Sequence, residues 1–197
     1  MAMSLLWMGF ALLGILKAQA QTRPEIPAPD LSRVPLQLNF LPREFEGTWY
    51  IVGLAGNAFK RAEQEQFKMY TTTYKLQEDN SYRVTSTLLR GNRCDKFVRT
   101  FIPNGLPGQF TLDNMLSHGL QDYIVRVMST NYNEFAMVYF KKTVDSTDYF
   151  KMTLYGRSEE LKPEVKENFI NLVKSLGLTN DNILFPARVE KCIHVKA

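Results

Sequence analysis

The sequence predicts an all-β fold: an eight-stranded antiparallel up-and-down barrel with one C-terminal α-helix packed outside it. Two observations lead to this fold class. From Trp49 onwards, short runs rich in Val, Thr, Tyr and Phe alternate with turn signals at regular spacing. A single amphipathic helix follows the last of these runs, and its apolar stripe needs a sheet to cover. With 197 residues, a single domain is the default.

The chain starts with a segment that resembles a secretory signal peptide, residues 1–20. Met3 to Leu16 is almost entirely apolar but too short to span a bilayer, and Ala18-Gln19-Ala20 supplies small residues for cleavage. An N-terminal membrane anchor is the alternative, disfavoured because no stop-transfer pattern follows. We therefore expect a secreted, extracellular protein without a membrane span, a route that also allows storage in secretory granules.

Residues 21–197 then form the predicted mature domain. Four prolines within residues 21–37 predict an extended N-terminal arm that does not pack. The eight strands that follow are rich in β-branched and aromatic residues and end at turn residues such as Gly91-Asn92. The predicted strands are Trp49–Ala55, Met69–Leu76, Tyr82–Leu89, Lys96–Pro103, Gly108–Leu112, Tyr123–Thr130, Glu134–Lys142 and Tyr149–Tyr155.

The predicted helix begins at Pro163, which suits a first helical turn, and ends at Gly177, a natural C-cap. Its apolar residues recur with the helical period of 3.6. They are Val165, Phe169, Leu172, Val173 and Leu176.

Composition narrows the class of function. The formal net charge of +4 is modest, and no run of Lys and Arg exceeds two residues, so nucleic-acid binding is not expected. Neither a phosphate-binding loop nor a Gly-x-Ser-x-Gly elbow occurs, and His118 and His194 lie far apart without metal-ligand spacing. The sequence favours a binding protein over an enzyme, without a metal site of its own.

Two cysteines, Cys94 and Cys192, follow the predicted signal peptide. In an oxidising compartment an even count favours pairing, here between residues 98 positions apart. Such a pair would leave no free thiol for catalysis or for a disulfide-linked complex with another protein.

The last predicted strand, Tyr149–Tyr155, alternates strictly between two kinds of side chain, which a strand places on opposite faces. One face is apolar and can pack beneath the helix: Phe150, Met152 and Leu154. The other combines a cation with hydroxyl groups: Tyr149, Lys151, Thr153 and Tyr155. If the second face lines an enclosed space, that space suits an anion with aromatic surface rather than a plain fatty chain.

Three motifs resemble those of the lipocalin family. Gly47-Thr48-Trp49 resembles the Gly-x-Trp signature, and Thr130-Asn131-Tyr132 resembles the second motif, usually Thr-Asp-Tyr. Arg157 resembles the basic residue whose guanidinium lies over the signature tryptophan. The resemblance implies that Trp49 plugs the closed end of the barrel and that Arg157 stacks on it by cation–π attraction.

The similarity to siderophore-binding lipocalins implies the ligand. It would be a ferric catecholate siderophore of the enterobactin type, whose capture withholds iron from bacteria in innate antimicrobial immunity and whose iron arrives already chelated. The resemblance assigns the binding cations to Arg99, Lys142 and Lys151. It assigns the remaining lining positions to Tyr70, Thr72, Ser86, Phe97, Tyr123 and Tyr155. Phe97 stands where relatives carry Trp, and the loop Met115–Gln121 is one residue shorter than theirs, with His118 near a family Tyr.

Charge matching agrees with this ligand, because a ferric tris-catecholate is a compact trianion with aromatic faces. At ~5 Å and an effective dielectric of ~20, one charge pair contributes about 3 kcal/mol before desolvation. The alternative is a carrier of a neutral odorant or retinoid, which three inward cations disfavour. A thiol-dependent isomerase activity would need a further cysteine. Contact of the outer face with a cell-surface receptor or a gelatinase is compatible with siderophore binding.

Overall fold

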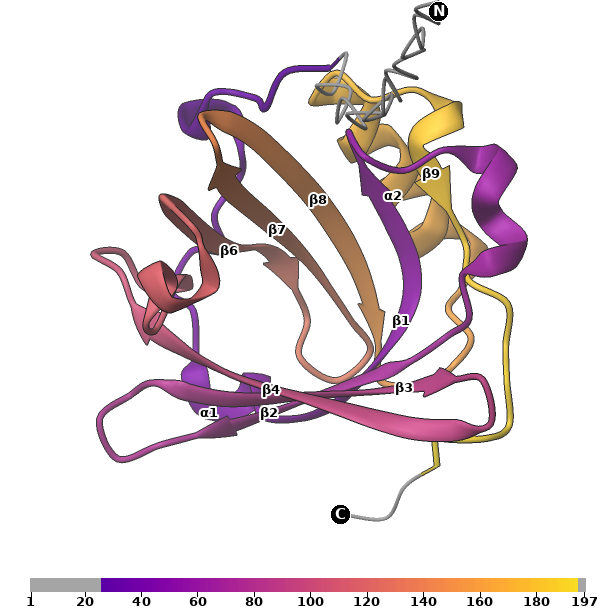
Figure 1. Ribbon diagram of the computed structural model, residues 1–197, viewed down its shortest axis with the longest axis horizontal. Coiled ribbons are helices and arrows are strands. Elements are labelled where there is room, and N and C mark those ends of the chain that lie inside the picture. Colours follow the sequence, from indigo (N-terminus) through magenta and orange to yellow (C-terminus); the bar gives the residue numbers. More distant parts are fainter. Residues whose placement is uncertain (1–25, 195–197) are drawn as a thin grey trace, which may run out of the picture.

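The computed structural model describes residues 26–194, so the predicted signal peptide, residues 1–20, lies outside the described residues. Within the described range, nine strands form one antiparallel sheet that curls into a barrel, and helix α2 packs outside it (Figure 1). The strands are β1 (Gly47–Gly56), β2 (Thr71–Leu76), β3 (Tyr82–Arg90), β4 (Arg93–Pro103), β5 (Gln109–Leu112), β6 (Asp122–Thr130), β7 (Phe135–Val144), β8 (Thr147–Gly156) and β9 (Ile183–Leu184). The helices are α1 (Pro42–Phe45), α2 (Pro163–Ser175) and the 3-10 helices η1 (Leu31–Arg33), η2 (Arg61–Gln66), η3 (Met115–His118) and η4 (Asn180–Asn182).

The barrel closes through β1. Strands β2 to β8 pair in chain order, and β1 then pairs with β8 along one edge and with β2 along the other. Near its second end β1 pairs with β9 instead of β2, and its register against β8 shifts between Ile51 and Gly53. The predicted up-and-down barrel is confirmed, and each predicted strand end lies within three residues of the observed one.

The alternation along β8 separates two cores, as predicted. Phe150, Met152 and Leu154 pack in an outer cluster with Phe169 and Val173 of α2. Tyr155 belongs to the cluster inside the barrel. Helix α2 ends at Ser175, and Gly177 just beyond it has the left-handed conformation, at φ +98°, with its N–H donating to the carbonyl of Lys174.

The closed end of the barrel is built on Trp49, which is fully buried and donates its Nε1–H to the carbonyl of Phe45 in α1 at 3.0 Å. The Arg157 guanidinium carbon lies 3.6 Å from the centre of the Trp49 ring. Its nitrogens donate to four backbone carbonyls, those of Glu44, Glu46, Thr48 and Tyr132. The predicted stacking of Arg157 on Trp49 is therefore confirmed.

The glycine of the first motif and the Thr130-Asn131-Tyr132 motif also contribute to the closed end. Gly47 has φ +97°, and a Cβ added there would lie 3.1 Å from Nη1 of Arg157, so the signature glycine leaves room for the guanidinium. Thr130 donates its hydroxyl to the carbonyl of Phe135 and accepts the N–H of Tyr132. This turn aims the Tyr132 carbonyl at Nε of Arg157, 2.8 Å away.

The prediction of an unpacked N-terminal arm is wrong for its described part, residues 26–37. Val34 is 2% exposed. Arg126 on β6 donates to the carbonyls of Leu31 and Val34, while the N–H of Gln37 donates to the carbonyl of Val127. The prolines restrict the arm's conformation, but the barrel wall supplies hydrogen bonds that hold it in place.

The predicted disulfide is confirmed, with the Sγ atoms of Cys94 and Cys192 bonded at 2.03 Å. It ties the C-terminal segment to the beginning of strand β4, where Cys94 is the second residue. Helix α1 and strand β9 were not predicted from the sequence, because four and two residues are too few to show a hydrophobic period. None of the helices in residues 26–194 is long and apolar enough to cross a membrane.

Candidate functional site

A cavity of about 800 Å³ opens at the end of the barrel opposite Trp49. Its walls come from segments far apart in the sequence, including the stretch after β1 with Phe59, β4 with Arg99, η3 with His118 and β6 with Tyr123. The hairpin of β7 and β8 supplies the remaining wall. A volume of this size holds a ligand of several rings.

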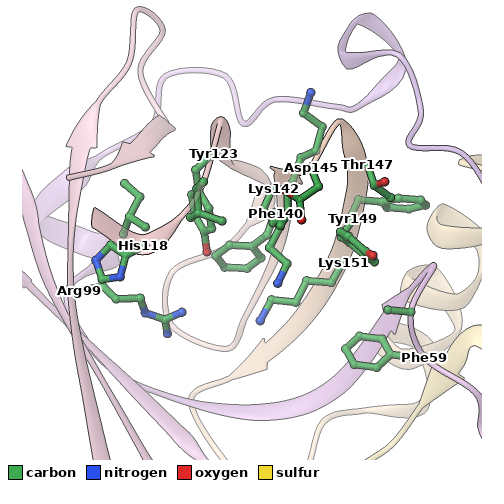
Figure 2. A pocket seen from close by; sticks show the side chains of 16 residues that line it. Phe59, Arg99, His118, Tyr123, Phe140, Lys142, Asp145, Thr147, Tyr149 and Lys151 are labelled. Atoms are coloured by element: carbon green, nitrogen blue, oxygen red, sulfur yellow. The ribbon is translucent and has the colours of Figure 1, made fainter. Parts of the chain in front are cut away.

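Four cations line this cavity, and one of them, Lys141, is held in an ion pair, which leaves three cations from three strands. Figure 2 shows the side chains of Arg99, Lys142 and Lys151 pointing into the same space. None of them takes part in the ion pairs found among the described residues, whereas neighbouring Lys141 pairs with Asp122 at 3.1 Å. Asp145, the carboxylate in the cavity lining, is exposed in the turn between β7 and β8. The site therefore carries excess positive charge.

The guanidinium of Arg99 is oriented by the hydroxyl group of Ser86, which is itself hydrogen-bonded to Thr72. Its Nη2 donates to Oγ of Ser86 at 2.9 Å, and that oxygen lies 3.0 Å from Oγ1 of Thr72. Ser86 and Thr72 are 3% and 2% exposed and do not line the cavity, although they were predicted as lining residues. They orient the guanidinium, while its buried Nε has no hydrogen-bond partner in the described structure.

Lys151 is half-buried, with its amine facing the cavity. Its Nζ lies 4.9 Å from the centre of the Phe140 ring, and Nζ of Lys142 lies 5.5 Å from that of Tyr149. Burial, and then repulsion from Arg99 and Lys142, lower the pKa of Lys151 to about 8. Lys142 is exposed at the mouth, so the cations span the cavity from rim to interior.

Phenol groups complete the interior. Tyr123 lines the cavity and stacks against Phe101, whereas Tyr70 and Tyr155, which were also predicted to line it, do not and lie against the core of the barrel. The Tyr155 hydroxyl is 3.0 Å from that of Tyr74. Burial raises the pKa of Tyr70, Tyr123 and Tyr155, so these groups stay neutral. A neutral phenol offers a hydrogen-bond donor without adding negative charge.

Phe97 is a predicted site residue that the structure does not bring to the cavity. Its side chain is 43% exposed, and its ring lies under Arg90, whose Cζ is 5.6 Å from the ring centre. Strand parity gives Phe97 the same face as Arg99, but parity does not say whether anything lies opposite that face.

Sequence reasoning missed some lining residues and undervalued others. Phe59 and Thr147 line the cavity from positions just outside the predicted strands, where no period marks their direction. His118 also lines it, although the sequence showed only that it lies in a shortened loop. Turn residues of this kind become visible only once the barrel end is assembled.

The lipocalin / cytosolic fatty-acid binding protein family model matches residues 46–190. The chain belongs to the lipocalin family. This lipocalin is 56% identical over 196 residues to human neutrophil gelatinase-associated lipocalin, covering 98% of this chain and 99% of the relative. The mouse protein of the same name is 52% identical over 198 residues, covering 98% of this chain and 99% of its own.

Two further comparisons show how broad the family is. This lipocalin is 35% identical over 194 residues to mouse prostaglandin-H2 D-isomerase, covering 98% of each chain. The solution NMR structure of lipocalin 12 from rat epididymis matches with a TM-score of 0.72 and 31% identity, covering 81% of this chain and 90% of that one. The relatives thus include a protein named as an enzyme.

Proposed function

We propose that this lipocalin is a secreted, non-enzymatic protein that binds ferric catecholate siderophores of the enterobactin type in its cavity. It would withhold iron from bacteria in innate immunity and carry the iron–siderophore complex. One observation carries the proposal: Arg99, Lys142 and Lys151 converge on one aromatic-walled cavity without forming ion pairs among the described residues.

The electrostatics support an anionic guest. Mutual repulsion among the cations contributes to the lowered pKa of Lys151, so a trianion would relieve a cost that the free protein bears. The rings of Phe140 and Tyr149 beside the two ammonium groups offer contact surface for catechol rings. The siderophore would hold the iron itself. Among the described residues, no three His, Cys, Asp or Glu gather as a metal site.

Two further activities would need a free cysteine: isomerase chemistry that uses a thiol, and a disulfide-linked complex with another protein. Cys94 and Cys192 are bonded to each other, so neither thiol is free for them. Similarity to a lipocalin named for gelatinase association supports a non-covalent contact with a gelatinase or a cell-surface receptor through the outer face. Such contact would act in addition to siderophore binding.

The test is a titration followed by the fluorescence of Trp49. Ferric enterobactin should quench it saturably with one site per chain, whereas an uncharged ferric hydroxamate of similar size should bind far more weakly. Retinol probes the alternative, a carrier of neutral apolar ligands, which the apolar side chains of Phe59, Leu112 and Leu120 in the lining favour. Saturable binding of retinol with none of ferric enterobactin would overturn the siderophore proposal.

A further inference from the structure

Lys151 has surroundings unlike those of an ordinary lysine on a strand. Its amine faces a cavity of about 800 Å³, with the Phe140 ring 4.9 Å away. It forms no ion pair among the described residues, and the charged groups that oppose it are Arg99 and Lys142. An amine placed among rings and like charges loses its proton more easily than one in water.

The loss of that proton changes the chemistry of the group. With a pKa of about 8 in place of 10.5, about a fifth of the amine is unprotonated at pH 7.4, against roughly one part in a thousand for an ordinary lysine. The unprotonated amine is a nucleophile, and a lysine desolvated beside other cations is a known way to activate one. A weaker base is also a weaker nucleophile, which offsets part of the gain.

We propose that Lys151 is a reactive amine that forms an imine with aromatic aldehydes carrying an anionic group. The anionic group would lie between Arg99 and Lys142, and the ring would lie against Phe140 and Tyr149. This inference depends on the cavity and its cations and does not require that the natural guest be a siderophore.

The reaction needs no other reagent. The nitrogen lone pair attacks the carbonyl carbon, a C–N bond forms, and the carbonyl oxygen takes up a proton. The nitrogen loses its two protons in turn, the hydroxyl oxygen takes up a second proton and leaves as water when the C–O bond breaks, and the C=N bond forms. No electrons are gained or lost overall. Besides Arg99 and Lys142, the titratable groups facing this space are Lys141, His118, Tyr123, Asp145 and Tyr149. Lys141 is paired with Asp122 and Asp148, and Asp145 is the exposed carboxylate at the mouth.

The experiment uses pyridoxal 5′-phosphate, an aromatic aldehyde with an anionic group, on the folded protein at neutral pH. Borohydride reduction traps the imine, and peptide mass spectrometry locates it. Lys151 should be labelled about tenfold or more faster than the exposed lysines Lys75 and Lys96. Its labelling rate should rise through about pH 8, well below the range of ordinary lysines. Labelling spread evenly over surface lysines would overturn the proposal.

Matched variants isolate the cause. Lys151→Arg keeps the charge but removes the nucleophile and should abolish the fast phase. Lys142→Ala removes one repelling cation and should slow labelling of Lys151, whereas Lys96→Ala on the outer face should not. Benzaldehyde, without an anionic group, should react severalfold more slowly. A fast phase that survives Lys151→Arg, in a variant whose circular dichroism shows it folded, contradicts the inference.

The same samples keep this inference separate from the siderophore proposal. An excess of ferric enterobactin should protect Lys151 if both are correct. Selective labelling with neither protection nor fluorescence quenching supports the imine and overturns siderophore binding. Quenching by ferric enterobactin with no selective labelling of Lys151 supports siderophore binding and overturns the imine proposal.

Discussion

Both ends of the barrel hold cations against aromatic rings, but the cations at the two ends differ in how many of their polar atoms have protein partners. At the closed end, Arg157 lies 3.6 Å over Trp49 and donates to four backbone carbonyls. At the open end, Arg99 has a buried Nε without a partner, and Lys142 and Lys151 form no ion pairs within residues 26–194. A satisfied cation stabilises the fold, whereas a cation left without partners creates a demand for a ligand.

The largest effect expected from this contrast is on ligand affinity. The double variant Lys142→Ala, Lys151→Ala removes two of three charges facing a trianion and should weaken ferric enterobactin binding about a thousandfold, or ~4 kcal/mol. Its free energy of unfolding should stay the same or rise, because repulsion is relieved. Fluorescence titration and thermal melts measure the two quantities.

The control for that variant removes the same charge elsewhere. Lys75→Ala, Lys96→Ala takes two exposed lysines from the outer face and should leave the affinity within about twofold. If the two double variants bind alike, the open-end cations do not meet the ligand.

The next effect is on stability at the closed end. Arg157→Ala removes the stacking on Trp49 and leaves carbonyl groups without donors, so the free energy of unfolding should fall by about 3 kcal/mol. Arg188→Ala breaks surface ion pairs with Glu159 and Glu160 and should cost less than about 1 kcal/mol. Urea denaturation measures both losses in the free energy of unfolding. Equal losses would show that the contacts of Arg157 stabilise the fold no more than a surface ion pair does.

A smaller loss is expected from Gly47→Ala, about 2 kcal/mol, because the new Cβ meets Arg157 at 3.1 Å in a left-handed backbone conformation. Gly91→Ala is a matched control, since Gly91 also has positive φ but nothing within 4 Å of the added Cβ. It should lose only about 1 kcal/mol, measured by the same denaturation, and the difference between the two variants isolates the crowding of Arg157.

The smallest effect concerns pH. Lys151 with a pKa of about 8 is half protonated at that pH in the free protein, and a bound anion favours the protonated form. Binding near pH 8 should therefore take up about half a proton, and affinity should fall as pH rises further. Calorimetry in two buffers of different ionisation enthalpy measures the uptake. Lys151→Arg, which stays charged, should show no such uptake, and equal uptake in both proteins would assign the proton to another group.

Much of the fold follows from local pattern. The strands, α2 and the two faces of β8 could be predicted because each depends on a period that repeats over several residues. The packing of residues 26–37 could not, because it depends on Arg126, which reaches the arm from a strand about 90 positions away. Helix α1 gains its place from Trp49 and Arg157, not from its own four residues.

The cavity lining, too, could be predicted only in part from local sequence pattern. Family resemblance, joined by strand parity for Lys151, placed Arg99, Lys142, Lys151 and Tyr123 on the cavity wall, where the structure has them. The resemblance also placed Ser86 and Thr72 there, but Arg99 covers these hydroxyl groups. Which of two inward residues reaches the open space depends on the length of the side chain above it, and no strand pattern encodes that.

The pairing of β1 with a neighbour on both sides has a consequence for behaviour in concentrated solution. Within the described residues, the sheet offers almost no free row of backbone N–H and C=O groups to which another chain's strand could attach. A barrel closed in this way offers little backbone edge from which fibrils could grow at high concentration.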